Sequence, residues 1–299
     1  MPPIVAVTGA TGNVGQALAR QLLHNGIAVR AIARNRTKLS ALAAKGAQEC
    51  SGDLQDVDFL AEAFHGADAV FAMIPEHPIV PDFLADKRRT AASLAGALKT
   101  ARVPRVVALS AIGVDPPTGI GPSAANGEFE EMLKSIPGLS VVALRAAFLM
   151  ENLLGATPII KSAGINGGPL RPDVSLAMIS TRDIASVAAE YLTARTFNGY
   201  TVRQLLGPRD HTCLDATSIL GAAIGKPGLG YAQFPYEEFR KGLLGAGFSP
   251  TAAATVVELF TAINEGRVQQ LAMRTAMSTT PTTLEEFARD VFAPAYRAG

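Results

Sequence analysis

The chain has 299 residues, of which 48% are hydrophobic and 18% charged, and this composition excludes disorder because enough apolar surface is present to offset chain entropy. There are 27 Lys and Arg against 26 Asp and Glu residues, a formal charge of +1, so no global field favours nucleic acid or an anionic membrane. The two cysteines, Cys50 and Cys213, are far apart in the sequence, which argues against a disulfide framework and a cysteine-based metal site.

The first residues carry none of the features of a secretory signal. The chain opens with Met1-Pro2-Pro3 and enters a strand-like run at once, without a basic start or a longer apolar region. No uncharged apolar stretch reaches the roughly 20 residues that span a bilayer. Together with the low cysteine count, this pattern fits a reducing cytosol, and we expect a cytoplasmic protein with no membrane contact.

Short β-branched runs alternate with longer segments of helical spacing in the first half of the chain. The predicted strands, most of them buried on both faces, are Ile4 to Thr8, Ala28 to Arg34, Gln48 to Ser51, Ala69 to Ile74, Arg105 to Ser110 and Ser140 to Arg145. The predicted helices between them are Val14 to Leu23, Leu39 to Ala43, Asp56 to Phe64, Asp82 to Ala101 and Glu128 to Ile136. This repetition predicts a doubly wound α/β fold, a parallel Rossmann sheet with helices on both faces.

The alternation weakens after Arg145. Strands are predicted at Val174 to Ile179 and Tyr200 to Leu206, a helix at Thr181 to Ala194, and a mostly helical tail from Leu214. We therefore expect a dinucleotide-binding Rossmann domain and a smaller, mostly helical lobe for a substrate or partner. The expected Rossmann domain covers residues 1–150, with 176–198 returning to it, and the smaller lobe covers 151–175 and 199–299.

The strongest local signal is the segment Val7 to Gly15, in which three glycines at three-residue spacing join the first strand to the first helix. Gly9 allows the turn, Gly12 lets the backbone approach a pyrophosphate, and Gly15 lets the helix pack tightly on the sheet. The helix N-terminus then directs unpaired N–H groups at the phosphates. The alternative is a plain strand-to-helix turn. The residues predicted to bind the cofactor here are Gly9, Thr11, Gly12, Asn13 and Val14.

The end of the second strand indicates which dinucleotide is bound. An acidic residue about 20 residues past the loop would bind the ribose hydroxyls of NAD, but no acid occurs between Gly15 and Lys45. Arg34 stands at the end of the strand instead, and a guanidinium can hold a 2′-phosphate by charge-assisted hydrogen bonds. We therefore expect NADP(H) in preference to NAD(H), with Arg34 as the first candidate and Arg36 as the second. The alternative is a solvated basic helix start.

The ends of the later strands supply further cofactor candidates, because ligands of open parallel sheets bind outside the carboxyl ends of the strands. Asp53, if not merely a turn or N-cap residue, can accept the adenine amino group. Met73 has an alternative role as core filler. The full set from these strand ends is Asp53, Leu54, Ala72, Met73, Ile74 and Ser110.

These motifs resemble those of the NmrA-like group of atypical short-chain dehydrogenases. The resemblance is carried by Thr8 to Gly15, Arg34-Asn35, Gly52 to Leu54, Leu109 to Ala111, Gly127 to Leu133, and Leu144-Arg145 followed by Phe148 and Met150 to Asn152. It implies that Phe148 lies at the cofactor. The layout is most similar to NADPH-dependent quinone and triphenylmethane-dye reductases, but the group also contains redox-sensing regulators that bind NADP without known catalysis.

Typical short-chain dehydrogenases resemble one another in a Tyr-x-x-x-Lys pair after the fifth strand, and this chain has none. Its first tyrosine is Tyr191. Some relatives have a lysine near the position of Asn126, where this chain has an amide that cannot act as an acid. Hydride transfer without that acid suits acceptors that delocalise electrons, such as quinones and cationic dyes. The catalytic residues stay unknown; Ser110 and His77 are weak candidates, with alternative roles as a cofactor-facing hydroxyl and a plain loop residue. The histidines show no metal-ligand spacing.

The function predicted from the sequence is an NADPH-dependent reductase that transfers hydride to a quinone-like or conjugated small-molecule acceptor. The alternative is an NADP(H)-binding, redox-sensing regulator of a protein partner, and a homodimer is left open. A sugar-nucleotide epimerase or dehydratase is a weaker third hypothesis, since such enzymes need the missing tyrosine.

Overall fold

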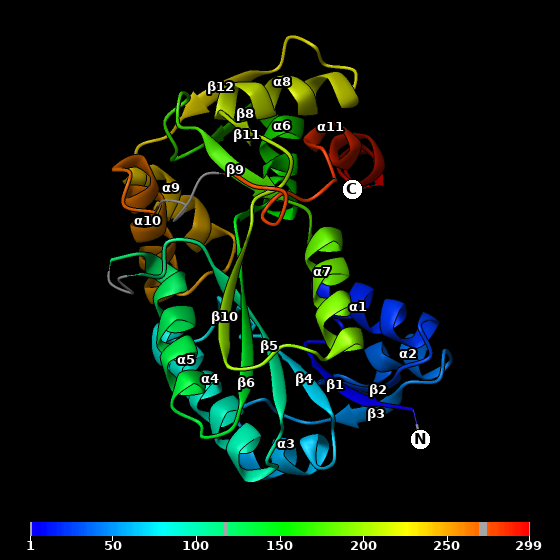
Figure 1. Cartoon of the computed structure of the whole chain (residues 1–299). Helices are drawn as coiled ribbons and strands as arrows, with labels where there is room; N and C mark the ends of the chain where they lie inside the picture. Colours follow the sequence, from blue (N-terminus) through cyan, green and yellow to red (C-terminus); the bar gives the residue numbers. More distant parts are fainter. Residues whose placement is uncertain (1, 116–118, 269–273, 299) are drawn as a thin grey trace.

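The computed structural model describes residues 2–115, 119–268 and 274–298, and its centre is a seven-stranded, fully parallel sheet (Figure 1). The strand order is β10-β6-β5-β4-β1-β2-β3, so the chain winds outward in both directions from the β1–β4 pair. The strands are β1 (Ile4–Thr8), β2 (Ala28–Ala33), β3 (Gln48–Ser51), β4 (Ala69–Ala72), β5 (Arg105–Ala111), β6 (Ser140–Ala146) and β10 (Tyr200–Leu205). The predicted doubly wound α/β fold is confirmed.

Helices cover both faces of this sheet and bury it in two apolar cores. One face carries α1 (Asn13–His24) and α7 (Thr181–Ala194), with the short η1 (Arg36–Leu39) and α2 (Ser40–Ala43) beside them. The other face carries α3 (Val57–Phe64), α4 (Phe83–Thr100) and α5 (Ala124–Lys134). Local signals set the ends of these helices. Asp56 and Asp82 accept hydrogen bonds from first-turn N–H groups of α3 and α4, and Gly26, with φ +75°, follows the end of α1.

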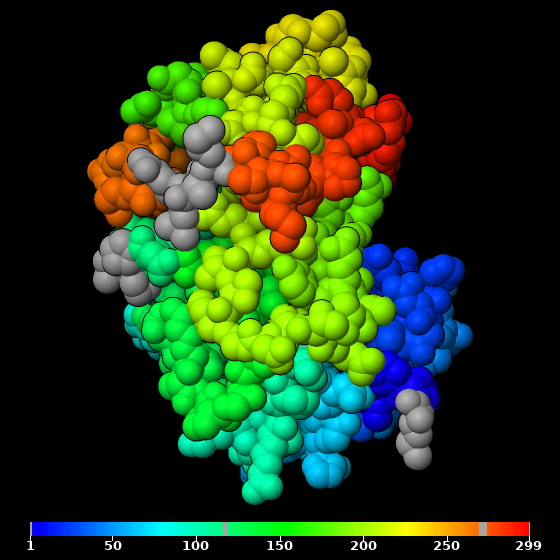
Figure 2. All heavy atoms as spheres, in the orientation of Figure 1, coloured from blue at the N-terminus to red at the C-terminus, as the bar shows by residue number. Residues whose placement is uncertain are grey.

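A smaller lobe stands over the carboxyl ends of the strands (Figure 2). It contains two small sheets, ordered β11-β9-β7 and β12-β8, and a third apolar core. Its elements are β7 (Phe148–Leu149), η3 (Met150–Ala156), α6 (Thr157–Ala163), β8 (Ile165–Gly168), β9 (Leu176–Ile179), β11 (Asp210–His211), α8 (Cys213–Ala223), β12 (Gly230–Gln233), α9 (Tyr236–Gly245), α10 (Pro250–Asn264), α11 (Leu284–Phe287), η4 (Ala288–Phe292) and α12 (Ala293–Ala298). The turn η2 (Gly121–Ser123) packs on α10.

The structure differs from the expected division in two places. The segment 176–198 was expected to return to the Rossmann domain, but its first part, β9, lies in the small sheet β11-β9-β7, and only α7 packs on the central sheet. Residues 199–299 were all expected in the smaller lobe, but β10 pairs in parallel with β6 along its whole length, from Tyr200 opposite Val141 to Leu205 opposite Ala146. The chain therefore adds a seventh strand to the central sheet before it leaves for β11. The strand expected from Val174 begins only at Leu176.

Among the residues that the structure describes, no helix combines the length and apolarity needed to cross a membrane.

Candidate cofactor site

The loop after β1 is held in a tight turn by its own backbone. Gly9 has φ +62°, and the N–H of Gly12 donates to its carbonyl oxygen at 2.9 Å. A Cβ at Gly15 would lie 2.3 Å from that same oxygen, so only glycine allows α1 to approach this closely. The tip of the loop, formed by Thr11, Gly12 and Asn13, is at least partly exposed, whereas Val14 is buried beneath it and offers a ligand only its backbone.

The N-terminus of α1 is free to hold an anion. No side chain caps it and no acid stands in its first turn. By contrast, side-chain oxygens cap α3, α4, α7, α8 and α10. First-turn N–H groups without an internal partner, together with the helix dipole, favour a phosphate at this point. The loop and the helix therefore fit the pyrophosphate of a dinucleotide.

The two candidate arginines differ in what surrounds them. Arg36 donates from Nε to Glu49 Oε2 at 3.0 Å, so its guanidinium already has a carboxylate partner. Arg34 follows the last residue of β2 and is exposed, and within residues 2–115, 119–268 and 274–298 its side chain forms no salt bridge. Its backbone is fixed because its carbonyl accepts a hydrogen bond from Ser51 Oγ at 3.1 Å. Arg34 is therefore the better placed of the two for a 2′-phosphate.

Met73 is the residue after β4 that faces the phosphate loop. Thr8 Oγ1 donates to the carbonyl of Phe71 and accepts from the N–H of Met73, at 3.1 and 3.0 Å, which ties the end of β4 to β1. A Cβ on Gly9 would meet the sulfur of Met73 at 2.5 Å. The side chains of the other strand-end candidates Ala72, Ile74 and Leu54 are buried in the apolar core, so only their backbones are available to a cofactor.

Asp53 is a turn residue that still has one carboxylate oxygen available. Its Oδ1 accepts a hydrogen bond from the N–H of Gln55 at 2.9 Å, which makes it a turn residue after β3. The side chain is exposed, and Oδ2 accepts no hydrogen bond within the described part of the chain. The prediction that this carboxylate binds the adenine amino group is compatible with the turn and stays a prediction.

Ser110 belongs to a buried polar cluster that the sequence did not reveal. Its hydroxyl donates to Glu130 Oε1 at 2.5 Å, and only 4% of the residue is exposed. Arg145 donates to both oxygens of Glu130, at 3.0 and 2.6 Å, and also pairs with Asp115. The phenol of Tyr200 donates to Oε2 at 2.5 Å. The Ser110 proton is therefore directed at a carboxylate on α5.

This cluster also determines how Tyr200 titrates. Burial and the hydrogen bond to the Glu130 carboxylate raise the pKa of its phenol well above the ordinary value. Burial alone would lower the pKa of Arg145, but its hydrogen bonds to Glu130 and Asp115 raise it. Both groups therefore hold their protons firmly, and Tyr200 is poorly suited to act as an acid near neutral pH.

His77 lies in the loop after β4 and forms a pair with Asp86 on α4. Its Nδ1 is 2.9 Å from Asp86 Oδ2, and both side chains are largely buried. Burial favours a higher pKa for Asp86, but hydrogen bonds from His77 and Gln55 outweigh it and hold the pKa below its usual value. The smaller lobe holds the same loop, because the N–H of Ser249 donates to the carbonyl of Pro78 at 2.7 Å.

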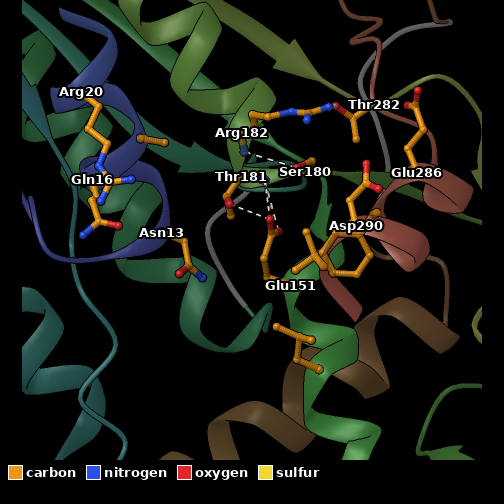
Figure 3. A pocket seen from close by; sticks show the side chains of 14 residues that line it. Asn13, Gln16, Arg20, Glu151, Ser180, Thr181, Arg182, Thr282, Glu286 and Asp290 are labelled. Atoms are coloured by element: carbon orange, nitrogen blue, oxygen red, sulfur yellow. Dashed lines mark hydrogen bonds between the residues drawn. The ribbon is translucent and has the colours of Figure 1, made fainter. Parts of the chain in front are cut away.

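Phe148 begins the chain's passage into the smaller lobe, as part of β7 beside β9, and is half-buried. Glu151 follows in η3, and its carboxylate accepts hydrogen bonds from the backbone N–H and the hydroxyl of Thr181, at 3.0 and 2.6 Å (Figure 3). These bonds connect the segment after β6 to the start of α7. No contact in the structure tests the cofactor role expected for Phe148.

A pocket of about 300 Å³ opens between α1, the start of α7 and the last helices of the chain. Figure 3 shows Asn13, Gln16 and Arg20 of α1 on one side and Glu286 and Asp290 on the other. Asn13 thus stands both at the phosphate loop and at the wall of this pocket. Within the described ranges, no group of three or more His, Cys, Asp or Glu side chains could hold a metal ion.

A doubly wound parallel sheet with a glycine loop at an uncapped helix defines a dinucleotide-binding protein. A family model described as NAD(P)H-binding matches residues 9–195, and the chain belongs to this family. The chain also shares its fold with NmrA, a negative transcriptional regulator, whose structure in complex with NADP superposes with a TM-score of 0.74 at 17% identity, covering 99% of this chain and 97% of that one.

Known proteins resemble the chain over nearly its whole length. It is 28% identical to the NAD(P)H azoreductase of Xenophilus azovorans over 257 residues, 86% of each chain. The structure of the NADPH-dependent quinone oxidoreductase QOR2 from Escherichia coli, complexed with NADPH, superposes with a TM-score of 0.80 at 23% identity, covering 96% of this chain and 99% of that one. The structure of the Citrobacter sp. triphenylmethane reductase complexed with NADP(H) superposes with a TM-score of 0.77 at 22% identity. This match covers 95% of this chain and 99% of that one. The two solved structures show that the chain shares the fold of these reductases.

Proposed function

We propose that the protein is an NADPH-dependent reductase that transfers hydride to a quinone-like or otherwise conjugated small molecule. The observation that carries the choice of cofactor is Arg34, an exposed guanidinium without a carboxylate partner at the end of β2, beside the uncapped N-terminus of α1. A 2′-phosphate at this position receives charge-assisted hydrogen bonds, whereas an unphosphorylated ribose gains nothing from the charge.

The choice of acceptor rests on what the chain lacks. No Tyr-x-x-x-Lys pair follows β5, and the hydroxyls of Tyr200 and Tyr231 are already committed, to Glu130 and to the carbonyl of Leu170. Reduction of a plain ketone needs an acid at the oxygen, but a quinone or a dye spreads the added electrons over its conjugated system. The nicotinamide supplies the hydride, and the chain supplies the position of both reactants.

The related proteins support the same class of acceptor. The azoreductase, the quinone oxidoreductase and the triphenylmethane reductase are named after three molecules that differ in shape and charge. The molecules share an extended conjugated system that takes up hydride. An acceptor of this kind is what we propose for the present chain, in a site between the carboxyl ends of β4 and β5 and the smaller lobe.

The test is NADPH oxidation by the purified protein with four acceptors: a quinone, an azo dye, a cationic triphenylmethane dye and a plain aliphatic ketone as the negative control. We expect turnover with at least one conjugated acceptor and none with the ketone. Binding of NADPH is measured separately by calorimetry. Tight binding with no turnover on any acceptor would overturn the reductase and favour the alternative, an NADP(H)-sensing regulator, whose partner would bind according to the ratio of oxidised to reduced cofactor.

A further inference from the structure

His77 has one ring nitrogen with a partner and one without. Nδ1 is bonded to Asp86, while Nε2 is buried and has no hydrogen-bond partner in the part of the chain that the structure describes. Leaving a buried polar atom without a partner costs about 1–3 kcal/mol, so such atoms call for an explanation. A carboxylate on Nδ1 fixes the tautomer and orientation of an imidazole and directs its other nitrogen at a reacting group.

The pair lies at the edge of the sheet where the reaction is proposed to occur. His77 comes five residues after the end of β4, and β4 lies between β1 with its phosphate loop and β5. Thr251 of α10 donates to the carbonyl of Pro81 at 2.8 Å and accepts from the N–H of Phe83, so the smaller lobe holds this loop at both contacts. In the site proposed above, a ligand between the strand ends and the smaller lobe would lie beside this loop.

The charges around the ring favour a proton carrier. On α4, Asp86 contacts His77 directly and Arg89 lies 3.4 Å from the far oxygen of Asp86. The buried Lys87 is paired with Glu76, the residue before His77. From α10, the groups in contact with the loop are Ser249 and Thr251, neither of which titrates. The one ionised group bonded to the imidazole is thus a carboxylate, which stabilises the protonated ring.

We propose that His77, positioned by Asp86, donates the proton that accompanies hydride transfer to a neutral acceptor. The step rests on the proposed reductase function. Hydride from NADPH forms a C–H, O–H or N–H bond on the acceptor and leaves NADP⁺, and the electron pair it brings makes a quinone or azo compound an anion. That anion takes the proton from Nε2, so a quinone becomes a hydroquinone and an azo compound a hydrazine. Solvent then reprotonates the ring.

Nε2 has no partner among the described residues. In this proposal the acceptor becomes its partner on binding, and the departing product opens the ring to the solvent that returns the proton. The chemistry separates two kinds of substrate. A quinone or an azo dye takes up a proton after the hydride, which a positioned donor delivers faster than solvent does. A cationic triphenylmethane dye becomes a neutral product on receiving hydride alone, and it therefore needs no donor. The same enzyme preparation can be assayed with both kinds.

The experiment compares His77→Gln with His65→Gln, a control at an exposed histidine that ends α3. We expect His77→Gln to lower kcat for quinone or azo reduction about a hundredfold, the usual contribution of a general acid, and to leave cationic-dye reduction and NADPH affinity within twofold. The pH profile of the wild-type rate with the quinone should lose its falling limb in His77→Gln. His65→Gln should match the wild type throughout.

Other outcomes have distinct meanings. Equal losses with neutral and cationic acceptors, with an unchanged pH profile, would make His77 a structural residue and overturn the proposal. If the dye is not a substrate, the pH profile with the quinone decides alone. Asp86→Asn should lower kcat less than His77→Gln does, and only with the quinone and the azo dye. This result is expected of a residue that positions His77 and does not itself touch the acceptor. No turnover by the wild type with any acceptor would instead overturn the reductase function on which this proposal rests.

Discussion

At the scale of single residues, we expect selection of the phosphorylated cofactor to depend on the guanidinium of Arg34. We expect Arg34→Asp to weaken NADPH binding about tenfold to a hundredfold, because a hydrogen bond to a charged group contributes roughly 1.5–3 kcal/mol and the new carboxylate repels the phosphate. NADH binding should change little. Calorimetric titration with both cofactors measures this, with Arg36→Ala as the matched control because Arg36 already pairs with Glu49. Equal losses for both cofactors would contradict the 2′-phosphate role.

Two glycines of the phosphate loop are expected to matter for different reasons, Gly15 for the packing of the fold and Gly12 for the binding of the cofactor. A Cβ at Gly15 would lie 2.3 Å from backbone oxygen, whereas at Gly12 the nearest atom would be 3.4 Å away, an ordinary contact. Gly15→Ala should therefore destabilise the cofactor-free protein by about 1–3 kcal/mol, as overpacking does. Gly12→Ala should unfold at the wild-type temperature but bind NADPH poorly, because its methyl group stands where the pyrophosphate approaches. Thermal unfolding with and without NADPH measures both effects; a stable Gly15→Ala would show that the loop can relax.

At the scale of elements, the carboxylate of Glu151 joins the segment after β6 to the start of α7. Glu151→Ala leaves the backbone N–H and hydroxyl of Thr181 without their partner, and we expect a loss of about 1–3 kcal/mol in the free energy of unfolding. Asp290→Ala is the control from the opposite wall of the same pocket, because its salt bridge to Arg289 is exposed and should contribute little to stability. Urea unfolding compares the two variants. An equal loss in the free energy of unfolding of both variants would show that the hydrogen bonds of Glu151 contribute no more than an exposed salt bridge does.

The elements of the sheet were predictable, but their distant contacts were not. The limits of β1 and β3 agree with the prediction, and the other four strands predicted in the first half differ by at most two residues, because continuous apolar runs mark strands buried on both faces. Edge strand β10 was predicted within one residue but was assigned to the smaller lobe, because its half-exposed residues lack the continuous apolar pattern of the central sheet and its pairing with β6 is a contact distant in sequence. The phosphate loop followed from its glycine spacing.

The polar contacts of the site were likewise not predictable, because the residues that form them are far apart in the sequence. Glu130 is 20 residues from Ser110, 15 from Arg145 and 70 from Tyr200 in sequence. Asp86 begins a run of four charged residues, Asp86 to Arg89, on an α-helix, yet it is buried against His77. A burial pattern of apolar residues locates strands and helices, yet it does not reveal which charged residues of a helix turn inward. Only a fold with defined register brings these groups together.

At the scale of the whole molecule, the Glu130 cluster joins α5 to three neighbouring strands, β5, β6 and the edge strand β10. One carboxylate thus receives hydrogen bonds from elements that are distant in sequence, and these bonds hold the last strand on the sheet. Removing one donor leaves a buried carboxylate less satisfied. The cluster should therefore be visible in the stability of the entire sheet domain.

Its pH dependence follows from the raised pKa of Tyr200. In the unfolded chain this phenol titrates near pH 10, whereas in the folded protein it keeps its proton to higher pH. The contribution of Tyr200 to the free energy of unfolding is complete below about pH 10. It is lost as the pH rises toward the pKa of the phenol in the folded protein, because over this range only the unfolded state is stabilised by losing the proton. We expect Tyr200→Phe to be less stable than the wild type near pH 8 and the difference to shrink near pH 11.

Because Tyr231 also has a raised pKa from burial, the difference between the two proteins, measured by urea unfolding, isolates Tyr200. Tyr236→Phe, at an exposed phenol, is the control, and a wild-type advantage that stays constant with pH would contradict the hydrogen bond to Glu130.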